Sequence, residues 1–224
     1  MLNRRGFTLV ELLAVITILG ILMAVGIASV SWILQRNKEM FYETSEKNII
    51  TTAKAYFSDH RASLPTVPGQ RRKLSLKTLE STGYFKKGDI VDYGKKACNL
   101  NTSFVYVLKK GDDYQYILHL DCPAKKIYRD DEVLKENSSL TNSSSFSSSN
   151  LTFNFSSNSI KLAGYQFTLF DASGNIIYNS DGASISGTSY NDSISLEPYM
   201  DRGIKKIVVT VYDEYGNYKT VSLG

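Results

Sequence analysis

The chain has few of the residues from which catalytic and metal sites are built. Its 224 residues include two histidines, two cysteines and one tryptophan. No group of His, Cys and Asp side chains has the spacing of a metal site or of a nucleophilic triad. We therefore expect that the protein is not an enzyme and that it uses no cofactor and no metal ion.

Proline is also scarce, and none of the four prolines precedes residue 65. Charge is absent from Leu12 to Leu34, a run that exceeds the roughly 20 apolar residues needed to span a membrane. A secretory signal has a shorter apolar core. Residues 7–34 are therefore predicted to form a single transmembrane helix. Arg4 and Arg5 precede it and favour a cytoplasmic N-terminus with an exported body, under the positive-inside rule.

Glu11 is an acid near the start of this apolar segment. A carboxylate at the centre of a membrane helix costs about 2.5–3.5 kcal/mol, so an acid in such a segment suggests a function and a partner. If the chain is cut after Gly6, the new amino group of Phe7 lies about one helical turn from Glu11. In an assembly, Glu11 of one subunit could then pair with the amine of its neighbour, since unpaired charges are costly in apolar surroundings.

The run RRGFTLVELL at residues 4–13 resembles the processing motif of type IV prepilins and type II secretion pseudopilins. In that family a prepilin peptidase cuts after the glycine and methylates the new N-terminal phenylalanine. The resemblance implies that residues 1–6 are a leader, that Gly6 is the cleavage site and that Phe7 is methylated. It also implies that Glu11 guides docking onto other pilin subunits, in a filament that starts in the cytoplasmic membrane and reaches the cell surface.

Three alternatives remain for the N-terminal segment. Arg4 and Arg5 faintly resemble a twin-arginine signal, and Gly26-Ile27-Ala28 has the small residues of a signal-peptidase site. Both of these would require an apolar core without Glu11. The third alternative is a plain membrane anchor.

The first helix is expected to continue beyond the membrane. Apolar residues recur at spacings of four or eight at Phe41, Ile49, Ala53 and Phe57. This stripe predicts an amphipathic helix, which Pro65 and Pro68 would end. A single helix from Phe7 to about His60 would be about 80 Å long. In the pilin family such a helix is both filament core and domain spine.

The region after this helix, within residues 35–136, is predicted to complete a pilin-like domain. A short helix is expected from Leu74 to Phe85. Aromatic and β-branched runs at 104–108 and 114–120 flank a glycine turn and predict a β-hairpin, in which Phe104 would lie opposite Leu118. Pilin domains carry a small antiparallel sheet on their helix, and this pattern is similar.

Cys98 and Cys122 bracket the predicted hairpin. In an exported body they would meet conditions in which disulfides persist, and the closed loop would stabilise the fold by about 3–4 kcal/mol. Two free thiols or a shared metal site are the alternatives. Because no third and fourth ligand lie nearby, we expect the disulfide.

The end of the chain is predicted to be an all-β unit behind a linker. Residues 137–150 are rich in Ser and Asn, a composition typical of flexible linkers. Within 151–224, two runs of alternating apolar residues are each followed by an Asp-x-x-Gly-Asn turn, at 171–175 and 213–217. The last hairpin resembles those of bacterial immunoglobulin-like surface domains. The alternative is a β-extension of the pilin domain, and calcium at the acidic turns is disfavoured against solvated carboxylates.

Charge is unevenly divided along the chain. Residues 35–135 carry 19 Lys and Arg against 13 Asp and Glu, whereas residues 136–224 carry 5 against 8. The sequence thus predicts an α+β protein that serves as a structural filament subunit, a minor pilin or pseudopilin presenting a β-domain to a surface ligand. The alternative is a DNA-binding minor pilin of a DNA-uptake pilus, for which the basic runs 71–73 and 86–87 are the candidates.

Overall fold

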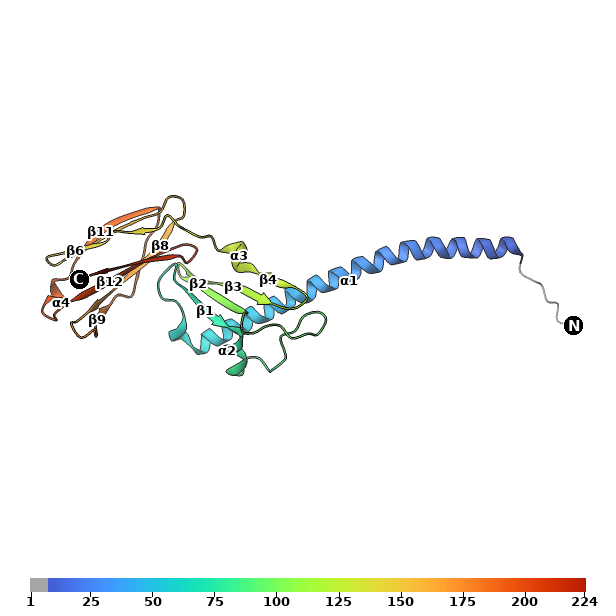
Figure 1. Cartoon of the computed structure of the whole chain (residues 1–224), viewed down its shortest axis with the longest axis horizontal. Helices are drawn as coiled ribbons and strands as arrows, with labels where there is room; N and C mark the ends of the chain where they lie inside the picture. The colour runs from blue at the N-terminus through green and yellow to red at the C-terminus, as the bar shows by residue number, and fades with distance from the viewer. Residues whose placement is uncertain (1–7) are drawn as a thin grey trace. The chain divides into compact units, whose positions relative to one another are not determined.

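The computed structural model describes residues 8–224, except for the side chains of residues 25–29. Two compact units make up the chain, Met1–Lys47 and Asn48–Gly224. A long helix opens the chain, and antiparallel sheets follow it (Figure 1). The fold class is α+β, as the sequence predicted.

The opening helix α1 runs without interruption from Leu9–Asp59 and contains 51 residues. It carries no proline, and the chain leaves it through a short 3₁₀ turn, η1 (Arg61–Ser63), before Pro65. The prediction of one continuous helix is confirmed. Within the described residues, no helix combines the length and apolarity of a membrane span. Residue 7 and the side chains of residues 25–29 belong to the predicted span and lie outside the described part.

The second unit contains a four-stranded antiparallel sheet next to the end of α1 (Figure 1). Its strands follow the order β1 (Arg71–Ser75), β2 (Phe104–Lys110), β3 (Asp113–Asp121) and β4 (Lys126–Tyr128). Ile49, Ala53 and Phe57 are buried at intervals of four residues along α1. The ring centre of Phe57 lies 6.2 Å from that of Tyr116 on β3, so this stripe of α1 covers one face of the sheet.

The hairpin of β2 and β3 forms, but its register differs by one residue from the predicted one. Phe104 lies opposite His119 rather than Leu118. The reason is the turn, which has only two residues between the paired Lys110 and Asp113. Its first residue, Gly111, has φ 56°, as a tight hairpin turn of this kind requires. A shift of one residue exchanges the faces of the sheet, and it turns Leu118 toward the buried side with Val105.

The helix predicted from Leu74 to Phe85 is shorter in the structure. Leu74 belongs to β1, where it pairs with Val105, and helix α2 covers Leu76–Ser81. Ser75 ends the strand and caps the helix, because its hydroxyl accepts a hydrogen bond from the backbone N–H of Lys77 at 3.1 Å. A further short helix, α3 (Arg129–Val133), follows β4.

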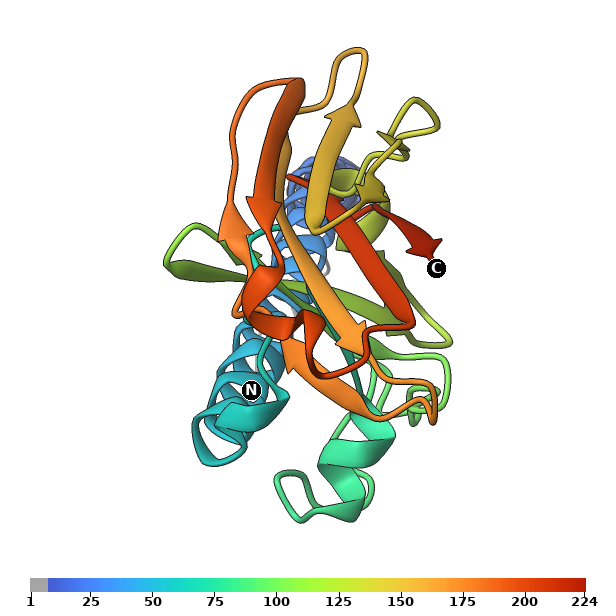
Figure 2. The same ribbon diagram turned by 90° about the vertical axis from the view of Figure 1, so that its left-hand side faces the viewer.

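The C-terminal part of the second unit consists of two antiparallel sheets with one shared core (Figure 2). One sheet contains β8 (Leu162–Phe170), β9 (Ile176–Asn179), β10 (Ala183–Ser184), β12 (Lys206–Asp213) and β13 (Tyr218–Leu223). The other contains β5 (Thr141–Asn142), β6 (Ser145–Ser147), β7 (Asn150–Ser156) and β11 (Ser189–Ser195), and helix α4 (Glu197–Met200) follows β11. Phe153 of β7 and Tyr165 of β8 pack across the core with ring centres 4.5 Å apart.

We call these two sheets, with strands β5 to β13, the β-unit. The segment expected to be a linker, residues 137–150, is built into it. It carries β5 and β6, which both pair with β7, and Leu140 is buried in the shared core. The amide of Asn142 donates to the carbonyls of Val209 and Lys219 at 3.0 and 3.2 Å. Its polar composition thus serves hydrogen bonding between the two sheets rather than flexibility.

Candidate functional site

The start of α1 is a capping box formed by Thr8 and Glu11. The Thr8 hydroxyl accepts from the Glu11 backbone N–H at 3.3 Å. In return, the Glu11 carboxylate accepts from the Thr8 backbone N–H at 2.9 Å and from its hydroxyl at 3.0 Å. These bonds satisfy donors that a helix start leaves free. The motif T-x-x-E could have been found in the sequence. Gly6 and Phe7, the predicted cleavage and methylation positions, lie outside the described residues.

The first part of α1 presents a large apolar surface. Its large apolar side chains are exposed in the single chain, at Leu9, Val10, Leu12, Leu13, Ile16, Ile18, Ile21, Leu22, Met23, Trp32 and Ile33 among others. An apolar surface of this extent marks contact with a membrane or with protein partners. Burying this surface in either kind of contact would be favourable, because it removes apolar side chains from water.

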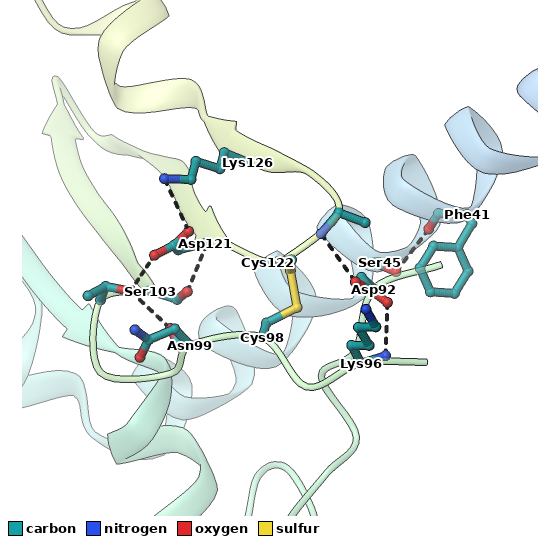
Figure 3. Close-up of a disulfide and its surroundings, with 12 residues drawn as sticks. Phe41, Ser45, Asp92, Lys96, Cys98, Asn99, Ser103, Asp121, Cys122 and Lys126 are labelled. Carbon is teal, nitrogen blue, oxygen red and sulfur yellow. Dashed lines mark hydrogen bonds and ion pairs between the residues drawn. A yellow bond between two sulfur atoms is a disulfide. The ribbon is translucent and has the colours of Figure 1, made fainter. Parts of the chain in front are cut away.

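The two cysteines form a disulfide, Cys98–Cys122, that closes the loop around the hairpin (Figure 3). Beside it, the buried carboxylate of Asp92 accepts from the backbone N–H of Lys96 at 2.8 Å and from that of Ala124 at 3.2 Å. The carboxylate therefore links the segments on both sides of the disulfide (Figure 3). Sequence reasoning missed Asp92, because no local pattern indicates a contact across 32 residues.

The carboxylate of each acidic turn of the β-unit accepts hydrogen bonds from its own turn. Asp213 is fully buried and accepts from the backbone N–H groups of Tyr215 and Asn217, both at 2.9 Å. The side-chain amides of Asn217 and Asn137 donate to its other oxygen at 2.8 and 2.9 Å. Asp171 has the same turn geometry, and its bonds from Asn175 hold the pKa of its carboxyl below the usual value. In the described residues, no group of three His, Cys, Asp or Glu side chains could hold a metal ion.

His119, the histidine of the hairpin, is packed between two aromatic side chains of the sheet. Its ring stacks between Phe104 and Tyr128, with ring centres 4.4 and 3.9 Å away. Its Nδ1 lies 2.8 Å from a carboxylate oxygen of Asp130 on α3. Because both ring faces are covered, His119 anchors α3 to the sheet rather than facing a substrate.

A groove of about 440 Å³ lies between β1 and the outer face of the β12–β13 hairpin. Arg71, Arg72 and Lys73 contribute one wall, and Tyr212 and Tyr218 belong to the other. We call it the basic groove. The ring centres of the two tyrosines are 6.2 Å apart. Burial raises the pKa of the Tyr212 hydroxyl, although the positive charge of Arg72 acts against this rise. The structure thus adds aromatic side chains to the basic run that the sequence singled out.

Comparison with known proteins supports the processing motif at the start of the chain. Residues 1–27 match the family model of the prokaryotic N-terminal methylation motif. The competence protein ComGC of Bacillus subtilis (strain 168) is 32% identical over 95 residues, which are 42% of this chain and 88% of that protein. No solved structure matches the chain. The chain therefore belongs to the type IV pilin-like proteins, and its motif implies processing by prepilin peptidase and assembly with other pilin subunits.

Proposed function

We propose that the protein is a minor, single-span subunit of a type IV pilus or of a type II secretion-like filament, and that it displays its β-unit at the cell surface. The observation that carries the proposal is the exposed apolar surface of α1, most of which lies within the residues that match the methylation motif. Such a helix needs lipid before assembly and neighbouring subunits afterwards. The filament places residues 35–136 and the β-unit outside the membrane.

The β-unit is the reason for proposing a minor subunit. It adds two sheets to a helix and a small sheet that already make up a pilin-like body. A bulky addition suits a subunit at the tip, or one used sparsely, better than a densely packed shaft. Immunogold labelling of filaments with antibodies to the β-unit tests this: labels at tips or at rare positions support the proposal, and continuous labelling contradicts it.

Cleavage after Gly6 and methylation of Phe7 are the first steps in this proposal. Mass spectrometry of the mature protein should find methylated Phe7 at the N-terminus. Gly6→Ala should block processing, because the peptidase of this family needs a residue without a side chain before the cut. Leu2→Ala, also in the leader, is the matched control and should be processed. A mature N-terminus at Ser29 would contradict the proposal, because the whole motif would then be lost.

A second candidate is a role in DNA uptake. Two observations favour it: the name of the relative, which is a competence protein, and the basic groove. Gene neighbours distinguish the two candidates, because competence, secretion and adhesion operons differ in content.

A further inference from the structure

The basic groove joins two parts of the second unit that lie far apart in the sequence. Its lining comes from the segment Gln70–Lys73, from Tyr106 on β2 and from the hairpin of β12 and β13. None of the lining residues is an acid. We propose that this groove binds a single strand of nucleic acid, with the basic side chains on its phosphates and tyrosines on its bases. The inference rests on the proposed filament role in one respect: export exposes the groove to nucleic acid outside the cell.

The charges in the groove are not neutralised within the protein. Arg71, Arg72 and Lys73 form no ion pair with any residue that the structure describes. Arg71 lies over the ring of Tyr106 at 5.0 Å, and Lys73 lies over the ring of Phe104 at 3.7 Å. These contacts fix the two side chains without cancelling their charge. Three adjacent positive charges in a hollow attract a polyanion and release its counterions.

Aromatic side chains in the groove favour nucleic acid over an acidic peptide. Tyr218 is 66% exposed on β13, which is unusual for a large aromatic side chain. It forms a platform of the kind on which bases stack in proteins that bind single strands. An acidic peptide would use the positive charge but would not need this exposed ring, and an anionic glycan is one of the outcomes that the experiment below distinguishes.

A single strand fits these observations better than a duplex. In a duplex, the faces of the bases are stacked on one another, so that only phosphates and base edges can be contacted. The exposed ring of Tyr218 would then have no role. In a single strand, one base can lie on Tyr218 while neighbouring phosphates meet Arg72 and Lys73.

The rival explanation is that the charges protect the edge of the sheet. β1 is an edge strand, and Arg and Lys on edge strands discourage pairing with other chains. This explanation accounts for Arg72 and Lys73, but it assigns no role to Tyr218. The two explanations therefore differ in what they predict for a Tyr218 variant.

The test is fluorescence anisotropy of the full chain in detergent with a labelled thymidine oligonucleotide of about 20 nucleotides. The double variant Arg72→Gln/Lys73→Gln should bind at least about tenfold more weakly, and its salt dependence should be lower by about 1.4 in log–log slope. The matched control is Lys86→Gln/Lys87→Gln, which removes two exposed charges outside the groove and should bind like the wild type. Thermal unfolding checks that both variants fold.

Tyr218→Ala should weaken binding by about fivefold to a hundredfold, and Tyr218→Phe should retain it, because stacking needs the ring and not the hydroxyl. Equal losses in the groove and control variants would overturn the proposal. So would tighter binding of a duplex of the same length with no effect of Tyr218→Ala, which would indicate phosphate contacts alone. Tighter binding of labelled heparin than of the oligonucleotide would also overturn it, in favour of an anionic glycan. Filament incorporation is measured separately, so failure of the filament role is distinguishable.

Discussion

Thr8 and Glu11 lie together at the first turn of α1, and we propose a second task for Glu11 besides capping. Their side chains close a capping box, which needs only hydrogen-bonding oxygens. The proposed docking of Glu11 onto the amine of a neighbouring subunit needs a negative charge as well. Replacing the charge while keeping the hydrogen bonds therefore separates the two tasks.

At this scale we predict that Glu11→Gln keeps the start of the helix, because Gln also completes a capping box. Incorporation into filaments should nevertheless fall at least about tenfold, since an unpaired amine in apolar surroundings costs several kcal/mol. Thr8→Ala is the control, because it removes the cap at a cost of about 1 kcal/mol but leaves the charge. Quantitative immunoblotting of sheared filaments measures both variants. If Thr8→Ala were the more harmful change, the cap would matter more than the charge.

At the scale of elements, the hairpin of β2 and β3 is held by the Cys98–Cys122 bond and by Asp92 beside it. The disulfide spans a sequence separation of 24 residues. In the chain-entropy model, a loop of this size loses enough freedom in the unfolded state to stabilise the fold by about 3.5 kcal/mol. The short β4 and the long loop before β2 depend on this closure, because neither has an extended ladder of its own.

We predict that Cys98→Ser/Cys122→Ser lowers the midpoint of thermal unfolding by about 10 °C, which corresponds to about 3.5 kcal/mol for a unit of this size. Circular dichroism of the full chain in detergent measures the midpoint. Wild-type protein with dithiothreitol should show the same decrease, whereas the double variant should not respond to the reductant. If reduction leaves the wild-type midpoint unchanged, the disulfide contributes nothing to stability.

At the scale of the second unit, the β-unit packs directly on the segment before β1. Val67 in this segment is fully buried. Gly69 has φ 81°, and a Cβ at this position would lie 2.5 Å from the carbonyl oxygen of Asp213. Any other residue at position 69 would therefore be disfavoured for two reasons: the backbone has a positive φ, and a Cβ would clash with the neighbouring carbonyl. This contact and the strands within residues 137–150 decide where the chain can be divided.

Removal of the β-unit tests whether it serves for surface display or is needed for filament assembly. A chain that ends after Lys135 loses β5 to β13 together, whereas one that ends after Asn150 keeps β5 and β6 without their partner β7. Removing the β-unit would expose Val67, so the shorter chain also carries Val67→Ser to make the exposed position polar. We predict that this chain is processed and enters filaments but no longer binds the surface ligand of the β-unit. The longer chain should be degraded. Immunoblots of membranes and filaments follow both. Degradation of the shorter chain as well would mean that the β-strands belong to the pilin fold itself.

Much of the architecture follows from local patterns. The continuous helix α1, the hairpin of β2 and β3 and the main strands β8 and β12 lie where periodicity and turn residues predict them. The disulfide also follows, because an exported chain with two cysteines and no further metal ligands near them offers one pair to oxidise. In the proposed filament site, Thr8 and Glu11 stand about one helical turn apart in the sequence, so their contact needs nothing beyond the helix itself.

The sequence by itself determined the long helix, its processing motif and the presence of two β-rich parts, because periodicity and motifs act between near neighbours. Only the tertiary structure decided the register of β2 and β3, where a two-residue turn set the pairing. It also decided the role of residues 137–150, whose polar side chains meet carbonyls more than 60 positions away. The basic groove is of the same kind, since Arg72 and Tyr218 come together only when distant strands pack. Contacts at such separations leave no periodic pattern in one sequence.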